Sequence, residues 1–234
     1  MQLFYNPNIN EQTIEFAFNK EESRHISKVL RKPVGDTLYI TNGCGWLFTA
    51  EILIADSKKC VAKIINKALQ VQRPYTLHLA VAPTKMNDRY EWFLEKVTEI
   101  GIDTITPIIC DRSERKMVKK ERFEKILQSG MKQSLNCYLP KLNEVITFKD
   151  FIAQNFEGDL FIAHCVETER KNLKQVLSPN THTTILIGPE GDFSFKEIEM
   201  ALKNDFIPVT LGTTRLRTET AAIVACHSAA FINQ

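Results

Sequence analysis

Residues 183–222, TTILIGPEGDFSFKEIEMALKNDFIPVTLGTTRLRTETAA, decide the fold of this chain. The stretch contains one arrangement twice: a short apolar run, a loop that contains glycine, and the start of a helix. The apolar runs are residues 185–187 and 209–211. Apolar runs bounded by turn residues predict buried strands, and ligands of α/β sheets bind beyond the carboxyl ends of such strands. Two neighbouring loops of this kind predict one shared binding crevice.

The first loop, residues 188–191, has the sequence GPEG. Its glycines let the backbone approach a ligand closely, and Pro189 fixes the turn between them. Ser194 and Glu197 follow with the spacing of a capping box, which predicts that a helix begins at Phe195. A lone GPEG is equally typical of an ordinary turn between a strand and a helix.

The second loop, residues 212–218, carries Arg215 and Arg217 and leads into a helix rich in small residues. Glu219 in the first turn of that helix suits the positive end of the helix dipole. Arginine remains cationic and offers several donors in a fixed fork, so either side chain could stabilise a developing negative charge. A structural ion pair with Glu219 or Glu190 is an equally good interpretation.

Composition places the chain among ordinary globular proteins. Charged residues make up 25% and hydrophobic residues 44% of the 234 residues, and the net charge is +2, so any RNA-binding surface must be a local patch. We expect a cytoplasmic protein, since no signal peptide or membrane-spanning run is visible. The six cysteines are scattered without a CxxC pair, which argues against a metal site or a disulfide framework. The five histidines are dispersed, and the spacing identifies no general base.

Residues 1–72 predict a small β-rich domain. Short β-prone segments, one of them at residues 37–41, surround one helix, which Asn19 can cap and which is expected to continue to Arg31. The polar side of this helix is basic, which indicates either a solvated face or a patch that binds phosphates. Residues 43–45, GCG, lie between two predicted strands, so we interpret them as a hairpin turn rather than a dinucleotide loop.

Residues 73–234 predict an α/β domain that follows a link, LQVQRPY, at residues 69–75. Strand and helix patterns alternate from residue 76 to the end, with one of the strands at residues 159–163, which favours a largely parallel sheet with helices on both faces. Asp88 and Glu91 are expected to open the first of these helices, and Gly101 to end it. Between the next strand and helix, residues 112–122 contain six basic and two acidic side chains, which indicates either a solubilising surface or an RNA contact.

The segments IGPEGDFS, LGTTRLRTETA and EKVTEIG, together with Lys85, resemble the RsmE family, bacterial 16S ribosomal RNA uracil-N3 methyltransferases of the SPOUT superfamily. Residues 25–45, HISKVLRKPVGDTLYITNGCG, resemble the PUA-like RNA-binding domain of that family. The resemblance implies a PUA-like β-barrel followed by an α/β trefoil-knot methyltransferase domain. It also implies S-adenosylmethionine as cofactor, 16S rRNA in the small ribosomal subunit as substrate, and a homodimer. We expect the small residues of the final helix to pack in or near the dimer contact, with packing inside the same subunit as the alternative; they are Ala221, Ala222, Ala225, Ala229 and Ala230.

The loops and the resemblance together give three groups of candidate residues. The catalytic candidates are Arg217, Arg215 and Arg112. The cofactor-binding candidates are Ile187, Gly188, Pro189, Glu190, Gly191, Leu211, Gly212, Leu216, Arg217, Thr218, Thr220 and Ala221. The RNA-binding candidates are Arg24, Lys28, Arg31, Lys85, Arg112, Arg115, Lys119 and Lys120. One departure is Leu135-Asn136, where the family usually has an arginine, so a contact that relatives make there is in doubt.

Three other functions fit parts of the sequence. A non-catalytic RNA-binding module would bind RNA but no cofactor. A nucleotide-binding enzyme could use GPEG for phosphate, although the chain has no GxxxxGK[ST] motif to support this. A SPOUT methyltransferase could also act on a different RNA position.

Overall fold

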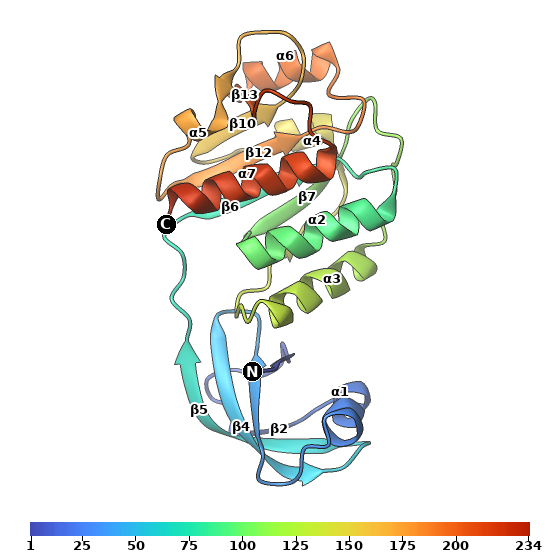
Figure 1. Cartoon of the computed structure of the whole chain (residues 1–234), viewed down its shortest axis with the longest axis vertical. Helices are drawn as coiled ribbons and strands as arrows, with labels where there is room; N and C mark the ends of the chain where they lie inside the picture. The colour runs from blue at the N-terminus through green and yellow to red at the C-terminus, as the bar shows by residue number, and fades with distance from the viewer. The chain divides into compact units, whose positions relative to one another are not determined.

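The structure is a computed structural model that describes all residues, 1–234, and it contains two compact units (Figure 1). The first unit comprises Met1–Gln72 and Met131–Leu139. The second comprises Arg73–Gly130 and Pro140–Gln234. The short segment at 131–139 packs with the first unit because Thr41 donates a hydrogen bond to the Cys137 carbonyl oxygen (3.1 Å) and Gln70 accepts one from the Cys137 N–H (2.7 Å).

The first unit is a five-stranded sheet with the order β1-β3-β4-β5-β2. Its strands are β1 (Leu3–Tyr5), β2 (Glu15–Ala17), β3 (Thr37–Thr41), β4 (Trp46–Ala55) and β5 (Cys60–Leu69). Fully buried aromatic and branched side chains form its core, among them Phe48, Ile40 and Ile52. Residues 42–45 connect the antiparallel strands β3 and β4, which confirms the predicted hairpin.

The helix of the first unit is less regular than the sequence predicts. Asn19 caps α1 (Lys20–Arg24) by accepting a hydrogen bond from the Glu22 N–H (2.9 Å), as expected. The chain then enters a π-helical turn, η1 (His25–Val29), and Arg31 has a φ of 53°. The prediction of one regular helix to Arg31 is therefore wrong. π-Helical turns have no strong local sequence signal, because their extra residue is accommodated by tertiary packing.

The second unit is built on a parallel sheet with the order β11-β13-β10-β12-β6-β7-β8, and β9 also pairs with β7. Every pairing in it is parallel, which confirms the predicted sheet type. The strands are β6 (Thr76–Val81), β7 (Thr104–Ile109), β8 (Lys141–Leu142), β9 (Ile146–Thr147), β10 (Asp159–Ala163), β11 (Lys171–Asn172), β12 (His182–Ile187) and β13 (Ile207–Thr210).

Helices cover both faces of this sheet (Figure 1). They are α2 (Asn87–Ile100), α3 (Lys120–Gln133), α4 (Phe148–Ile152), α5 (Leu173–Val176), α6 (Phe195–Lys203) and α7 (Thr218–Ile232). Ala80, Ile162 and Leu186 point towards the core beneath α4 and α6. Because side chains alternate along a strand, their neighbours Leu79 and Ile185 face the side that α7 covers. None of the helices is both long and apolar enough to span a lipid bilayer.

Helix starts show where local signals succeed and fail. Ser194 and Glu197 form the predicted capping box, and α6 begins at Phe195. α2 instead begins at Asn87 with Met86 as its N-cap, so the prediction that Asp88 and Glu91 open it is wrong. Glu91 forms an ion pair with Arg122 (2.6 Å) from α3, a partner that the local sequence does not reveal.

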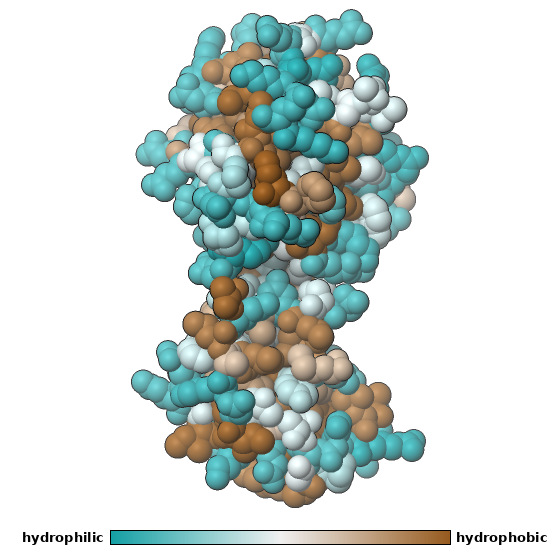
Figure 2. All heavy atoms as spheres, turned by 60° about the vertical axis from the view of Figure 1, so that its left-hand side comes forward, coloured by the Kyte–Doolittle hydropathy of each residue, from teal (hydrophilic) through white to brown (hydrophobic).

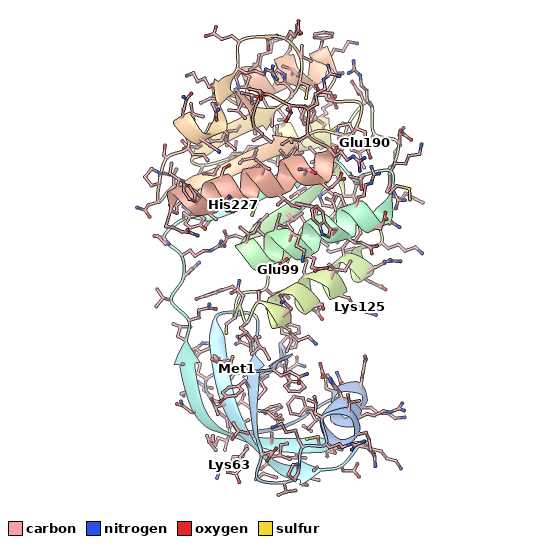
Figure 3. All side chains as sticks on the ribbon, viewed as in Figure 1. Met1, Lys63, Glu99, Lys125, Glu190 and His227 are labelled. Atoms are coloured by element: carbon pink, nitrogen blue, oxygen red, sulfur yellow. The ribbon has the colours of Figure 1, made fainter.

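The small residues of α7 pack inside the second unit. Ala222, Ala225 and Ala229 are buried, and α7 contacts α2, β6 and β12. The exposed side chains of α7 are His227 and Phe231, whose rings stack with their centroids 6.0 Å apart; Figure 3 labels His227 on this helix. The alanines therefore allow the helix to approach its own sheet closely.

His78 makes the stability of the second unit depend on pH. Burial and the nearby charge of Lys141 lower the pKa of His78 from 6.5 to about 4. Because the folded pKa is below the unfolded one, the unfolded chain takes up the proton first as the pH falls from 6.5 to 4. At about 1.4 kcal/mol per pKa unit, we expect a loss of about 3 kcal/mol of unfolding free energy across that window. Urea unfolding of wild type and His78→Gln at pH 7, 5.5 and 4.5 checks this, and equal pH slopes for both proteins would contradict it.

Candidate functional site

The carboxyl ends of four neighbouring strands lie in one row at the edge of the parallel sheet. Ile187 of β12 pairs with Val81 of β6 and with Ala163 of β10, and Ala163 pairs in turn with Val209 of β13. The segments that follow these strands therefore meet at this edge, as the two repeated loops predicted. A pocket of about 220 Å³ lies there.

The pocket contains more than half of the expected cofactor-binding residues. Those that line it are Ile187, Gly188, Leu211, Gly212, Leu216, Thr218 and Ala221, together with the catalytic candidate Arg215. Expected residues that do not line it are Pro189, Glu190, Gly191, Arg217 and Thr220. The lining combines apolar side chains with backbone groups of both loops, which is typical of a small-molecule site.

The first loop is fixed from outside the pocket. The Glu190 carboxylate accepts a hydrogen bond from the Lys85 N–H (2.9 Å), and Figure 3 labels Glu190 in this loop. Arg112 donates to the Gly191 carbonyl oxygen (2.8 Å). Glu197 accepts from the Asp111 N–H (2.9 Å) in addition to capping α6. Arg112 and Lys85 therefore hold the loop and do not line the pocket.

The second loop joins the first at the start of α7. The Thr218 hydroxyl donates a hydrogen bond to the Gly188 carbonyl oxygen (3.0 Å). Gly212 has a φ of 151°, and no atom lies within 4 Å of the position that a Cβ would take, so bare backbone faces open space here.

Arg215 and Arg217 are exposed and make no ion pair. The acidic residues considered as their partners have other neighbours, because Glu219 lies 3.9 Å from Arg89 and Glu190 is bonded to the backbone of Lys85. Both guanidinium groups are therefore available to a substrate.

A third loop, residues 164–170, also lines the pocket and was missed by the sequence reasoning. It follows β10 and contributes His164, Cys165, Glu167 and Arg170. Asp192, the residue directly after the first loop, accepts a hydrogen bond from the Cys165 N–H (2.8 Å) and so connects the third loop to the first. The strand at 159–163 was predicted, but its place between β12 and β13 was not, and only that place brings the loop to the pocket.

His164 is the most buried polar side chain of this third loop. It is 4% exposed, and neither Nδ1 nor Nε2 has a hydrogen-bond partner. Burial is the main cause that lowers the pKa of His164; the charge of Arg170 lowers it further, and the carboxylate of Asp192 opposes both. The imidazole is therefore neutral at pH 7, with one nitrogen that donates and one that accepts.

The basic candidates fall into paired and unpaired groups. In the first unit Arg24, Lys28 and Arg31 are exposed and make no ion pair. In the second unit Lys120 pairs with Glu144, whereas Lys119 is exposed and unpaired. Arg115 hydrogen-bonds Asn87 and the Lys85 carbonyl oxygen, and Lys85 pairs with Glu114 (2.8 Å).

Comparison with known proteins agrees with this geometry. Residues 71–230 match the RNA methyltransferase domain family, and residues 18–65 match the RNA methyltransferase PUA domain family. The chain is 32% identical to ribosomal RNA small subunit methyltransferase E from Buchnera aphidicola (strain APS of the Acyrthosiphon pisum subspecies), over 90% of this chain and 86% of the relative.

Two solved structures are similar over nearly their whole length. A probable rRNA-methyltransferase from Porphyromonas gingivalis is 41% identical, with a TM-score of 0.89 over 97% of this chain and 95% of its own. A Legionella pneumophila protein described as a methyltransferase, in complex with the cofactor SAM, is 28% identical, with a TM-score of 0.88 over 99% and 97%. This chain therefore belongs to the RNA methyltransferase family, within the group of ribosomal RNA small subunit methyltransferases E.

Proposed function

We propose that this protein transfers a methyl group from S-adenosylmethionine to N3 of a specific uridine in 16S rRNA of the small ribosomal subunit. The observation that supports this most directly is the pocket at the carboxyl edge of the parallel sheet. Its walls are the two loops whose sequences match the family. The similar Legionella protein was solved with SAM bound, which supports the same cofactor for this chain.

The residues of the pocket fit such a cofactor. Leu211, Leu216 and Ala221 offer an apolar wall, and the open space over Gly212 lets the backbone approach the ligand. The cofactor supplies an electrophilic methyl group when bound. Backbone donors of both loops can bind its polar parts, as in other small-molecule sites.

The exposed arginines of the second loop suit the chemistry of the target. In such a transfer N3 would take the methyl group in place of its proton, the carbon–sulfur bond would break with its electron pair left on sulfur, and the proton would pass to water. Negative charge spreads onto the uracil carbonyl oxygens, where a guanidinium can stabilise it. We assign this role to Arg217 and Arg215. Arg112 positions the first loop, since its side chain binds the Gly191 carbonyl oxygen.

The basic surfaces are proposed to bind the RNA backbone. Lys119→Ala is expected to weaken binding of a small-subunit RNA fragment and to reduce the slope of log K against log[salt] by about 0.7–0.9, because one phosphate contact is lost. Lys120→Ala is the matched control, since Lys120 is already paired with Glu144 and should change the slope less. Filter binding between 50 and 300 mM salt measures both slopes. Equal slopes for wild type and Lys119→Ala would show that Lys119 does not contact an RNA phosphate.

A homodimer in the cytoplasm is the assembly that the resemblance implies. Ala222, Ala225 and Ala229 of α7 are buried within the second unit, so we propose that exposed apolar side chains near them form the dimer contact instead. Phe231 of α7 is 68% exposed and Trp92 of α2 is 47% exposed, while the two helices contact each other. Light scattering at micromolar concentration tests this proposal, and a monomer mass would exclude it.

Incubation of the protein and labelled cofactor with small subunits that lack the modification tests the function. We expect one label per subunit, at N3 of a uridine, located by mass spectrometry of nuclease fragments. RNA binding without cofactor binding would indicate a binding module, and ATP binding in place of the cofactor would indicate a nucleotide enzyme. Label on another base or on ribose would assign the chain to a different reaction.

A further inference from the structure

The third loop, which follows β10, places a buried histidine at the wall of the pocket, and nothing in the protein accounts for its two ring nitrogens. His164 is 4% exposed, and both nitrogens lack a hydrogen-bond partner. A buried polar group without a partner costs stability, so its retention calls for a ligand. We propose that His164 binds the adenosyl part of the cofactor through both ring nitrogens, an inference that rests on the proposed function.

Two hydrogen bonds fix the backbone of His164 before any ligand arrives. Arg170 donates a hydrogen bond through Nη1 to the His164 carbonyl oxygen, which closes the loop back on its first residue. On the other side, Asp192 accepts from the Cys165 N–H (2.8 Å). The backbone of His164 is therefore held on both sides, and the residue belongs to the wall of the pocket together with Gly188 and Leu216.

The chemistry of a neutral imidazole selects one part of the cofactor. A neutral ring offers one donor and one acceptor. The two ring nitrogens point in different directions, so two different groups of the ligand must reach them. The ribose hydroxyls and the adenine edge of the adenosyl part supply uncharged donors and acceptors, whereas the methionine part supplies a carboxylate and an ammonium group whose charges would be buried against a ring that carries none. The adenosyl part therefore matches the neutral ring better.

Titration calorimetry with two ligands tests the assignment. S-adenosylhomocysteine contains both parts of the cofactor, whereas 5′-methylthioadenosine has the adenosyl part without the amino acid. We expect His164→Phe to weaken both ligands by the same factor, about ten- to thirtyfold, because their hydrogen-bonding groups lose their partner. His164→Gln, which keeps a donor and an acceptor, is expected to recover much of the affinity.

Two further measurements separate binding from folding. Without ligand, His164→Phe should unfold at a temperature no lower than wild type, since the ring nitrogens have no protein partner to lose. The matched control is His182→Phe, at the opposite end of β12 from the pocket and exposed, which should leave both affinities within twofold.

The outcomes are distinct. Unchanged affinity in His164→Phe overturns the inference, and a loss confined to S-adenosylhomocysteine overturns the choice of the adenosyl part. If His164→Phe does not fold, the protein needs the imidazole for its structure, and His164→Gln becomes the deciding variant. The inference is then overturned if His164→Gln binds both ligands with wild-type affinity but unfolds at a lower temperature. Wild type that binds neither ligand would instead refute the proposed function.

Discussion

Arg217→Ala is expected to lower the rate of methyl transfer at least about 100-fold while affinity for S-adenosylmethionine stays within a few-fold of wild type. Thr218, the next residue, is buried and bonded to the Gly188 carbonyl oxygen, so the backbone of Arg217 is fixed beside the first loop. The guanidinium itself is exposed and does not line the pocket. It can therefore reach a bound base without contributing to the cofactor site.

Single-turnover methylation with saturating small subunits, combined with calorimetry of the cofactor, measures the two effects separately. Arg217→Lys is the control, because it keeps the charge but loses the fork of donors, and an intermediate rate is expected. Arg215→Ala shows whether the neighbouring arginine shares the role. If Arg217→Ala methylates at the wild-type rate, Arg217 has no catalytic role.

Gly212→Val is expected to reduce cofactor affinity by about 100-fold or more. The backbone of Gly212 has a φ of 151°, and the added Cβ would point into space where no protein atom lies within 4 Å. Two effects therefore combine: the branched side chain strains the loop and occupies the volume through which the ligand approaches the backbone. Calorimetry with S-adenosylhomocysteine measures the loss.

The chain offers a matched control for strain. Gly35, in the first unit, also has a positive φ (90°) and open space at its Cβ position. Gly35→Val should lower the unfolding temperature about as much as Gly212→Val does, but it should leave cofactor affinity unchanged. If both variants bind as wild type, bare backbone at position 212 is not part of the cofactor site.

Features set by neighbouring residues could be predicted from the sequence. The capping box of Ser194 and Glu197 depends on four adjacent residues and formed as expected. The strands at 37–41 and 159–163 have their predicted bounds, since apolar runs between turn residues have few alternatives. The pairing of the two repeated loops at one edge followed from the general behaviour of parallel sheets.

Features set by strand order and packing could not be predicted. His164 and Arg170 line the pocket only because β10 lies between β12 and β13, and no local pattern specifies that order. The π-helical turn at 25–29 follows α1, where the Ser23 hydroxyl donates to the Phe18 carbonyl oxygen and accepts from the Cys60 N–H, contacts that local sequence patterns do not reveal. Figure 2 shows hydrophobic surface on the first unit, which was likewise not predicted. The exposed apolar side chains of this unit include Ile65 and Val71.

The position of β12 in the sheet has a consequence for how the protein is made. β12 lies in the middle, between β6 and β10, yet it is synthesised after both of them; His182 pairs with Thr76, 106 residues earlier. Pairing over such a separation is slow, and until β12 arrives the edges of β6 and β10 are open to other strands. A nascent chain that ends before residue 182 lacks the wall of the pocket. We therefore expect cofactor binding to begin only after β12 and the second loop have been synthesised.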